Sequence, residues 1–176
     1  FGSAEAVYFA DPNEFDLLRI SAGLKAALRD KSMDRVQTVL ERCDQLGLWI
    51  LTYQDGAYPD RLLELKDYPL VLYGKGKQLR FDEELAIGIV GARKCTPYGE
   101  LMAGRLGLDL ARSGALVVSG IAPEIDAAAL RGALKGGGTV VSVLGNGIDV
   151  IYPKENRWYY EDVAAAGALM SEYPPG

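Results

Sequence analysis

The residues best suited to chemistry form one short segment, Gly91-Ala92-Arg93-Lys94, which directly follows an apolar run. This order predicts a strand, a tight loop and a helix that begins near Tyr98. Such a loop presents backbone N–H groups to a phosphate. Gly91 lets the backbone approach a ligand, Arg93 can hold two phosphate oxygens, and Lys94 adds a point charge. The same spacing also suits an ordinary turn whose cations face water, and the segment alone does not decide between the two.

The composition narrows the chemistry further. The 176 residues include no histidine and two cysteines, Cys43 and Cys95. This excludes Ser-His-Asp and Cys-His catalytic units, any zinc site that contains histidine, and a zinc site of four cysteines. Any reaction would have to use carboxylates, lysine, tyrosine or the substrate itself. A binding function is therefore favoured, and we expect no catalytic residue, no metal site and no cofactor.

Charge and hydropathy indicate where such a protein would act. The net charge is −5, so nucleic-acid binding would need a local group of cations. No apolar run approaches the ~20 residues of a membrane span, and the N-terminus has no signal-peptide pattern. Two cysteines far apart in sequence suit free thiols in a reducing compartment. These features predict a cytoplasmic protein with no membrane segment.

Residues 1–47 are predicted to be a small helical segment. Apolar side chains recur at mostly three- and four-residue intervals over 14–28, with a break at 21–23. A second helix is predicted from a cap at Ser32 to a stop at Gly47. No chemically reactive side chains cluster here, which favours a packing role over a site.

Residues 48–176 are predicted to form an α/β domain. Two strands come first, at 48–53 and 69–73. Near-continuous apolar strands then alternate with helices, which indicates a parallel sheet buried on both faces. The predicted strands are 86–90, 115–118, 139–144 and 168–170, and the predicted helices are 98–112, 124–135 and 155–166. We therefore expect a doubly wound, mainly parallel sheet.

The carboxyl ends of these strands should line one crevice, where such sheets bind ligands. Each end carries a small loop, and the later ones are Ser119-Gly120, Gly145-Asn146-Gly147 and Ser171-Glu172. Lys154 and Asn156 could add polar groups to the crevice or form its solvated rim. The pair Gly145 and Gly147 lacks the third glycine of a dinucleotide fingerprint, so it is weak evidence for NAD.

The other acidic and aromatic side chains near the crevice each allow two interpretations. Asp126 and Asp149 could orient a ligand hydroxyl or act as acid or base, or could be ordinary carboxylates at a helix start or in a loop. One of Trp158, Tyr159 and Tyr160 could stack on a base, or all three could belong to the core.

Five blocks of sequence, in the same order, resemble the DprA/Smf family of DNA-processing proteins. No single block is as specific as the ordered set, which covers 58–176. The blocks are Tyr58–Leu62 with Asp67–Gly74, Ile89–Lys94 with Thr96–Gly99, Ser119–Ala122 with Ile125–Ala129, Val143–Asp149 with Tyr152–Asn156, and Gly167-Ala168 with Ser171–Gly176.

This resemblance implies an extended Rossmann-like, DNA-binding domain at 48–176 that is incomplete at its C-terminus. It also implies that 1–47 is part of a helical domain of the SAM or helix-hairpin-helix type. Family members bind single-stranded DNA during natural transformation, protect incoming DNA, help load the RecA recombinase and usually form a homodimer. No catalytic reaction is implied.

Carried onto matching positions, the resemblance makes Gly91, Ala92 and Arg93 a phosphate-binding loop in which Arg93 is the principal cation. Lys94, Ser119 and Gly120 would line the same pocket. Together with the crevice residues above, the predicted DNA- or phosphate-binding set is Gly91, Ala92, Arg93, Lys94, Ser119, Gly120, Gly145, Asn146, Gly147, Lys154 and Asn156.

One loop departs from the family pattern. After Ala122 the family usually has Arg-Gly-Ile-Asp, and this chain has Pro123-Glu124-Ile125-Asp126. A carboxylate here would repel phosphate, so we expect Arg93 to carry more of the binding. Glu124 could instead hold the ribose of a small ligand. That leaves an alternative open: a nucleotide-binding or nucleoside-monophosphate-cleaving enzyme that uses the same phosphate crevice.

Overall fold

The computed structural model describes residues 1–176, and its contacts divide them into two compact units, 1–40 and 41–176. The first unit is helical, as predicted, and its buried side chain is Phe15. The helical stretch predicted over 14–28, with a break at 21–23, is a 3-10 helix followed by a short α-helix. The break falls slightly earlier than predicted, because Ser21 caps the α-helix by accepting the Leu24 N–H at 3.2 Å. Its elements are α1 (Ala4–Phe9), η1 (Pro12–Leu17), α2 (Ala22–Arg29) and the start of α3 (Asp34–Leu46).

The division between the units falls inside α3, whose last residues carry the buried Cys43. The domain boundary expected from sequence, between 47 and 48, lies just beyond the end of this helix and stays a prediction.

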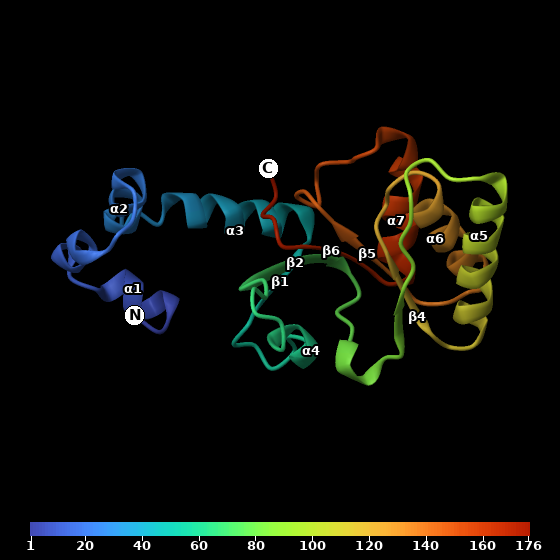
Figure 1. Ribbon diagram of the computed structural model, residues 1–176, viewed down its shortest axis with the longest axis horizontal. Helices are drawn as coiled ribbons and strands as arrows, with labels where there is room; N and C mark the ends of the chain where they lie inside the picture. The colour runs from blue at the N-terminus through green and yellow to red at the C-terminus, as the bar shows by residue number, and fades with distance from the viewer. The chain divides into compact units, whose positions relative to one another are not determined.

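The second unit contains a six-stranded mixed sheet with the strand order β1-β2-β6-β5-β4-β3 (Figure 1). The strands β3 to β6 run parallel to one another, whereas β2 is antiparallel to both β1 and β6. The predicted α/β class with a mainly parallel sheet is confirmed. The strands are β1 (Trp49–Thr52), β2 (Val71–Gly76), β3 (Ala86–Gly88), β4 (Leu116–Ser119), β5 (Val140–Leu144) and β6 (Ala168–Ser171).

Three helices connect the parallel strands in sequence order. Each crossover steps the same way along the sheet, and right-handed crossovers of that kind place their helices on one face. Figure 1 shows the three helices together, with the short α4 (Asp60–Leu63) apart from them. The connecting elements are α5 (Pro97–Arg112), α6 (Ile125–Lys135), η3 (Lys154–Asn156) and α7 (Arg157–Ala166), and η2 (Phe81–Glu83) precedes β3.

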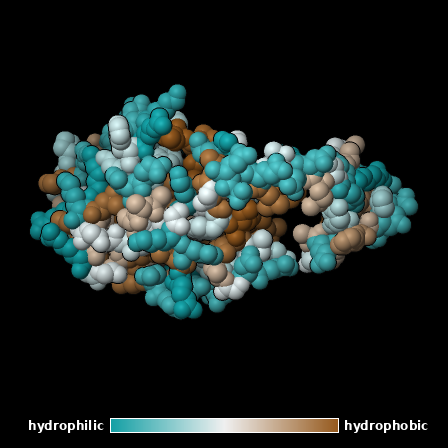
Figure 2. Space-filling view, turned by 180° about the vertical axis from the view of Figure 1, so that it is seen from behind, coloured by the Kyte–Doolittle hydropathy of each residue, from teal (hydrophilic) through white to brown (hydrophobic).

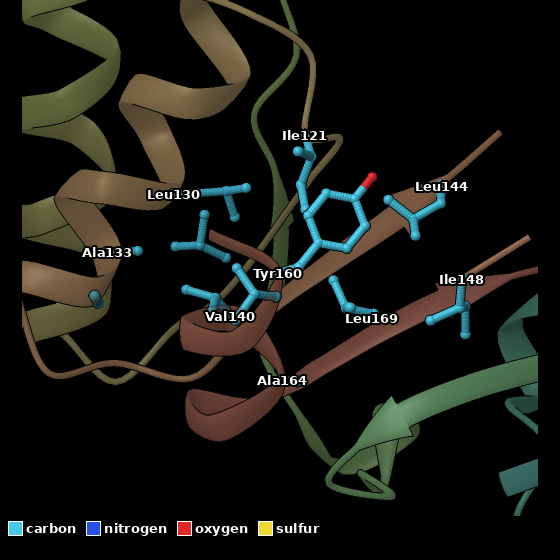
Figure 3. Packing of buried hydrophobic residues seen from close by; sticks show 12 residues of the cluster. Ile121, Leu130, Ala133, Val140, Leu144, Ile148, Tyr160, Ala164 and Leu169 are labelled. Carbon is cyan, nitrogen blue, oxygen red and sulfur yellow. The ribbon is translucent and has the colours of Figure 1, made fainter. Parts of the chain in front are cut away.

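Strand alternation divides the core between the two faces of the sheet. On the helical face, Val117, Val140 and Leu169 pack against α6 and α7. Figure 3 shows the ring of Tyr160, from α7, among Ile121, Leu144 and Leu169. On the other face, Leu116, Val141 and Met170 pack against residues of the first hairpin and of the loops around α4 and η2. Loops and single helical turns therefore cover the face of the sheet opposite the three helices.

Helices α5 and α6 pack with their backbones in contact. A Cβ atom added at Gly132 would overlap the carbonyl oxygen of Gly104, and one added at Gly107 would overlap that of Ala129. Alanines at 128 and 129 complete the contact. This close packing fixes the loops at the N-terminal ends of both helices relative to each other.

Hydrophobic side chains also reach the surface. Figure 2 shows brown hydrophobic areas among the teal on the face seen from behind. In the second unit, Val90, Tyr98 and Leu101 are 80%, 70% and 68% exposed. No helix combines the length and the hydrophobicity that a bilayer crossing needs.

Candidate nucleic-acid interface

The loop after β3 is held between the end of β4 and the start of α5. The Ile89 N–H donates to the Val118 carbonyl at 2.9 Å, and the Ser119 hydroxyl donates to the Ile89 carbonyl at 2.6 Å. Thr96 then caps α5 by accepting the Gly99 N–H at 3.1 Å. The loop that carries Arg93 is thus fixed at both ends.

Gly91 is required by packing against α6. A Cβ atom at this position would lie 2.5 Å from a methyl carbon of Ile125, closer than any real contact allows. The sequence suggested instead that this glycine lets the backbone approach a ligand. Packing alone is sufficient to explain it.

A cavity of about 400 Å³ opens at the carboxyl ends of the strands, between the loops that follow β3, β4 and β5. This is where ligands bind in sheets of this kind. Of the predicted binding set, four residues line it: Arg93, Gly120, Gly145 and Asn146. Its other walls are Ile121, Ala122, Pro123, Asp126, Val143, Leu144, Tyr152 and Pro153.

The remaining predicted residues lie outside the cavity lining. Ser119 is buried and uses its hydroxyl to join two loops, as described above. Gly147 lies against the Pro174 carbonyl, 2.6 Å from where its Cβ would be. Asn156 donates from its side-chain nitrogen to the Ile121 carbonyl at 2.8 Å and so supports a cavity wall. Ala92, Lys94 and Lys154 are exposed. Contact of these residues with DNA stays a prediction.

Asn146 shapes the loop after β5. Its side-chain nitrogen donates to the carbonyl oxygens of Gly147 and Val150, at 2.9 and 2.6 Å. Both bonds are within the loop, so its side-chain carbonyl oxygen is the atom left to face a ligand.

Asp126 is the carboxylate of the cavity. Its residue is 8% exposed, and its Oδ1 atom is buried without a hydrogen-bond partner. Burial raises the pKa of this carboxyl, while the N–H groups of Gly91, Gly120 and Ala122 and the charge of Arg93 act in the opposite direction. The sequence placed Asp126 at the start of a helix, but only the structure shows that one oxygen lacks a donor.

Tyr152 is the aromatic residue of the cavity, and sequence reasoning missed it. Its backbone N–H donates to the Tyr160 hydroxyl, which donates in turn to the Tyr152 carbonyl, both at 3.1 Å. Tyr160 is buried in the core, whereas Tyr152 is 64% exposed. The three aromatic residues considered from sequence, Trp158 to Tyr160, are absent from the cavity lining. Its position beside Pro153, in the loop that closes the crevice, is the sequence feature that could have identified Tyr152.

Glu124 sits next to the cavity without lining it. Its φ of 68° makes it the one residue other than glycine with a positive φ, at the place where the family usually has glycine. Its carboxylate accepts the Cys95 backbone N–H. A hydrogen bond between the two side chains is the main cause that raises the pKa of the Cys95 thiol to about 11 and lowers the pKa of Glu124. The carboxylate is therefore bound to the loop that follows Arg93.

No group of three or more cysteine, aspartate or glutamate side chains is placed to hold a metal ion. A larger hollow, about 810 Å³, runs along α5 and α6 away from the strand ends. Two of its arginines, Arg105 and Arg131, pair with Asp109 and Glu100. The crevice at the strand ends is the better candidate site, because it combines an exposed cation with a buried acceptor.

Comparison with known proteins gives consistent matches. A family model described as DNA recombination-mediator protein A matches residues 49–176. The chain is similar to protein Smf of Synechocystis, with 39% identity over 140 residues that cover 78% of this chain and 35% of the relative. It is also similar to the DNA processing protein DprA of Bacillus subtilis, with 32% identity over 141 residues that cover 80% and 48%. The chain thus spans about a third to a half of the length of these relatives.

Two solved structures resemble the fold. The crystal structure of DNA processing protein A from Streptococcus pneumoniae aligns with a TM-score of 0.70 and 28% identity, over 93% of this chain and 60% of that one. The structure of DNA processing protein A from Helicobacter pylori, described for its single-stranded DNA binding mode, aligns with a TM-score of 0.62 and 32% identity. That alignment covers 71% of this chain and 56% of the other.

Proposed function

Since this chain belongs to the DNA recombination-mediator protein A family, whose members are also named DprA and Smf, we propose that it processes DNA by binding single strands. The single-stranded DNA would bind at the carboxyl ends of the parallel β-strands. The observation that carries the proposal is the exposed Arg93 on the wall of the 400 Å³ cavity there. A guanidinium can hold two phosphate oxygens at once. The Helicobacter pylori relative, described as binding single-stranded DNA, supports the same assignment.

We propose binding without a chemical step. Asp126 is the one carboxylate on the cavity wall, and the chain has no histidine to act as its partner. The alternative enzyme would need Glu124 to hold a ribose. That carboxylate accepts the Cys95 N–H and lies outside the cavity, which counts against nucleoside-monophosphate cleavage.

Replacing Arg93 with alanine should weaken binding of an oligothymidylate by about fivefold. The slope of log affinity against log salt should become shallower by about 0.7, the value for one lost phosphate contact on a single strand. Fluorescence anisotropy at several salt concentrations measures both quantities.

Arg105→Ala is the matched control. Arg105 is an equally charged, exposed side chain, but it lies on α5 outside the cavity and pairs with Asp109. Its removal should leave both affinity and slope close to those of the unmodified protein. Equal effects of the two variants, or no effect of Arg93→Ala, would contradict the placement of DNA at the cavity.

Replacing Glu124 with alanine separates the two candidate functions. If the ligand is DNA, loss of a negative charge beside the phosphate loop should leave binding unchanged or strengthen it by up to about threefold, as expected for one partly screened charge. If the protein cleaves nucleotides with this carboxylate, the variant should lose turnover. Anisotropy with oligothymidylate, run beside a nucleoside-monophosphate hydrolysis assay, gives the answer.

The finer roles are proposals that rest on family membership. We propose that the whole protein acts in the cytoplasm, forms a homodimer, protects incoming single strands and helps load the RecA recombinase. The exposed Tyr98 and Leu101, one turn apart on α5, are compatible with a protein contact. Light scattering of the whole protein tests the dimer, and a strand-exchange assay with RecA tests the loading role.

A further inference from the structure

A groove runs between α5 and α6, which lie beside each other in Figure 1. It follows α5 from Pro97 to Arg112 and encloses about 810 Å³. At 1.5 Å per residue, this length of α5 corresponds to about 24 Å, or just over four helical turns. The groove is therefore long enough to hold a short helix.

The floor of the groove is apolar, and it is low because two glycines meet there. A Cβ atom added at Gly132 would overlap the Gly104 carbonyl, so the helices touch at their backbones. Leu101 and Leu108 border the floor from α5, and Ala128 borders it from α6. Leu101 is exposed and Leu108 is half-buried. The groove thus leaves in water hydrophobic surface that a bound partner would cover.

The charged residues make one end of the groove positive. At the N-terminal end of α5, Glu100 accepts a hydrogen bond from Arg131 at 2.7 Å, and this pair across the groove is neutral. Arg112 and Lys135, in the last turns of α5 and α6, are exposed and have no ion-pair partner. The negative end of each helix dipole offsets about half a charge. Each of these two cations therefore stays in excess, although the net charge of the chain is −5.

The lining favours a protein over a nucleic acid as the occupant. It contains no aromatic side chain on which a base would stack. Its carboxylates, Glu100 and Asp109, would repel phosphates, and they already pair with two of its four cations. A long apolar floor with charge at one end is instead the kind of surface on which an amphipathic helix docks.

We propose that this groove docks an amphipathic helix of a partner protein. The helix would place apolar side chains spaced three and four residues apart on the floor, and at least two carboxylates of its first turn beside Arg112 and Lys135. Carboxylates in the first turn also stabilise the positive end of the partner's own dipole, so the helix would run antiparallel to α5. The proposal goes beyond DNA binding and does not depend on it, because the groove and the DNA cavity share no lining residue.

The test uses the whole chain and three fluorescent synthetic peptides of about 16 residues, the length of the groove, in an alanine-rich background that favours helix. The first peptide has leucines at i, i+4, i+7 and i+11 and two glutamates in its first turn. In the second, glutamines replace the glutamates, and in the third, serines replace the leucines. By fluorescence anisotropy, the first should bind about fivefold more tightly than the second, the scale of two exposed ion pairs. The third should show no binding.

Substitutions in the groove locate the bound peptide. Gly104→Leu places a side chain on the floor, and its Cβ meets only the Ala128 carbonyl, at an ordinary 3.5 Å. This variant should keep its circular dichroism spectrum and bind the glutamate peptide about tenfold more weakly, the scale of a lost anchor. Replacing Arg112 and Lys135 together with glutamine should abolish the preference for glutamate over glutamine. Lys66→Gln is the matched control, an exposed cation outside the groove, and should change neither result.

Three results would overturn the proposal. The first is equal binding of the glutamate and glutamine peptides, or binding that Gly104→Leu leaves intact. The second is displacement of the glutamate peptide by an oligothymidylate, which would make the groove a polyanion site. The third is self-association of the chain that Gly104→Leu abolishes in sedimentation velocity, which would make a second copy the occupant. The salt dependence of DNA binding in Arg93→Ala is measured separately, so failure here leaves the proposed function intact.

Discussion

Replacing Gly132 with alanine is expected to destabilise the 41–176 unit by about 3 kcal/mol, the upper end of the usual cost of overpacking. A Cβ at this position overlaps the Gly104 carbonyl and lies 3.0 Å from the Leu108 nitrogen. Both obstacles are backbone atoms of α5, so no side-chain rotation can relieve them. The two helices would have to separate along their main contact.

Gly104→Ala is the matched control. It is also a glycine inside a helix of the same interface, but its Cβ would meet only the Ala128 carbonyl, at an ordinary 3.5 Å. The gain in helix propensity, up to about 1 kcal/mol, is the same for both substitutions. The difference in unfolding free energy between Gly132→Ala and Gly104→Ala therefore measures the cost of the overlap with the α5 backbone.

Urea unfolding followed by tryptophan fluorescence measures this difference, because both tryptophans, Trp49 and Trp158, belong to the second unit. Similar midpoints for the two variants would mean that α5 and α6 can separate at little cost. Gly132→Ala should also weaken DNA binding, since Arg93 lies in the loop that precedes α5 and Asp126 lies in the first turn of α6.

The order of strands and helices in the second unit could be predicted because its signals are local. Continuous apolar runs mark the buried parallel strands, and Thr96 followed by Pro97 marks the start of α5. The position of the crevice follows from the same pattern, since the carboxyl ends of parallel strands meet at one edge. These inferences need only neighbouring residues and the rules of sheet topology.

The roles of individual loop residues depend on contacts between distant residues. Gly91 meets Ile125, and the Ser119 hydroxyl meets the Ile89 carbonyl across 30 positions. Nothing in the spacing of these residues distinguishes a packing glycine from one that approaches a ligand. The residue types at these positions therefore fit a phosphate-binding loop, but the structure also gives these residues packing and hydrogen-bonding roles.

The roles of the aromatic residues could likewise not be predicted from sequence spacing alone. Tyr152 and Tyr160 lie eight residues apart and bond to each other, yet one is in the core and the other on a cavity wall. Helical spacing indicates that α7 has a buried face, and Tyr160 falls on it. Tyr152 precedes the helix in an irregular segment, where periodicity gives no information about side-chain direction.

The conformation of Glu124 explains why the Cys95 thiol is expected to be unreactive. Its left-handed backbone is one that residues other than glycine seldom adopt, with a cost of order 1–3 kcal/mol, and it places the carboxylate against Cys95. The carboxylate favours the protonated thiol, because it accepts a hydrogen bond from the S–H and would repel a thiolate. This is the physical cause of the thiol pKa of about 11.

Replacing Glu124 with alanine is therefore expected to raise the alkylation rate of Cys95 at pH 8 by about tenfold or more. The thiolate is the reactive species, and a return of the pKa from about 11 toward 9 increases its fraction by roughly 100-fold. The lower pKa also makes the thiolate a weaker nucleophile, which offsets roughly tenfold of that gain. Iodoacetamide labelling followed by mass spectrometry of the Cys95 peptide measures the rate.

Two comparisons make this result specific. Glu124→Gln keeps an acceptor oxygen but removes the charge, so its rate should fall between those of alanine and the unmodified protein. Cys43 is buried, with its pKa raised chiefly by burial, and should stay unlabelled in every variant. An unchanged Cys95 rate in Glu124→Ala would show that the carboxylate does not rest on this thiol in solution. In that case Glu124 would be free to approach a bound phosphate, and its removal should strengthen DNA binding by more than the threefold expected here.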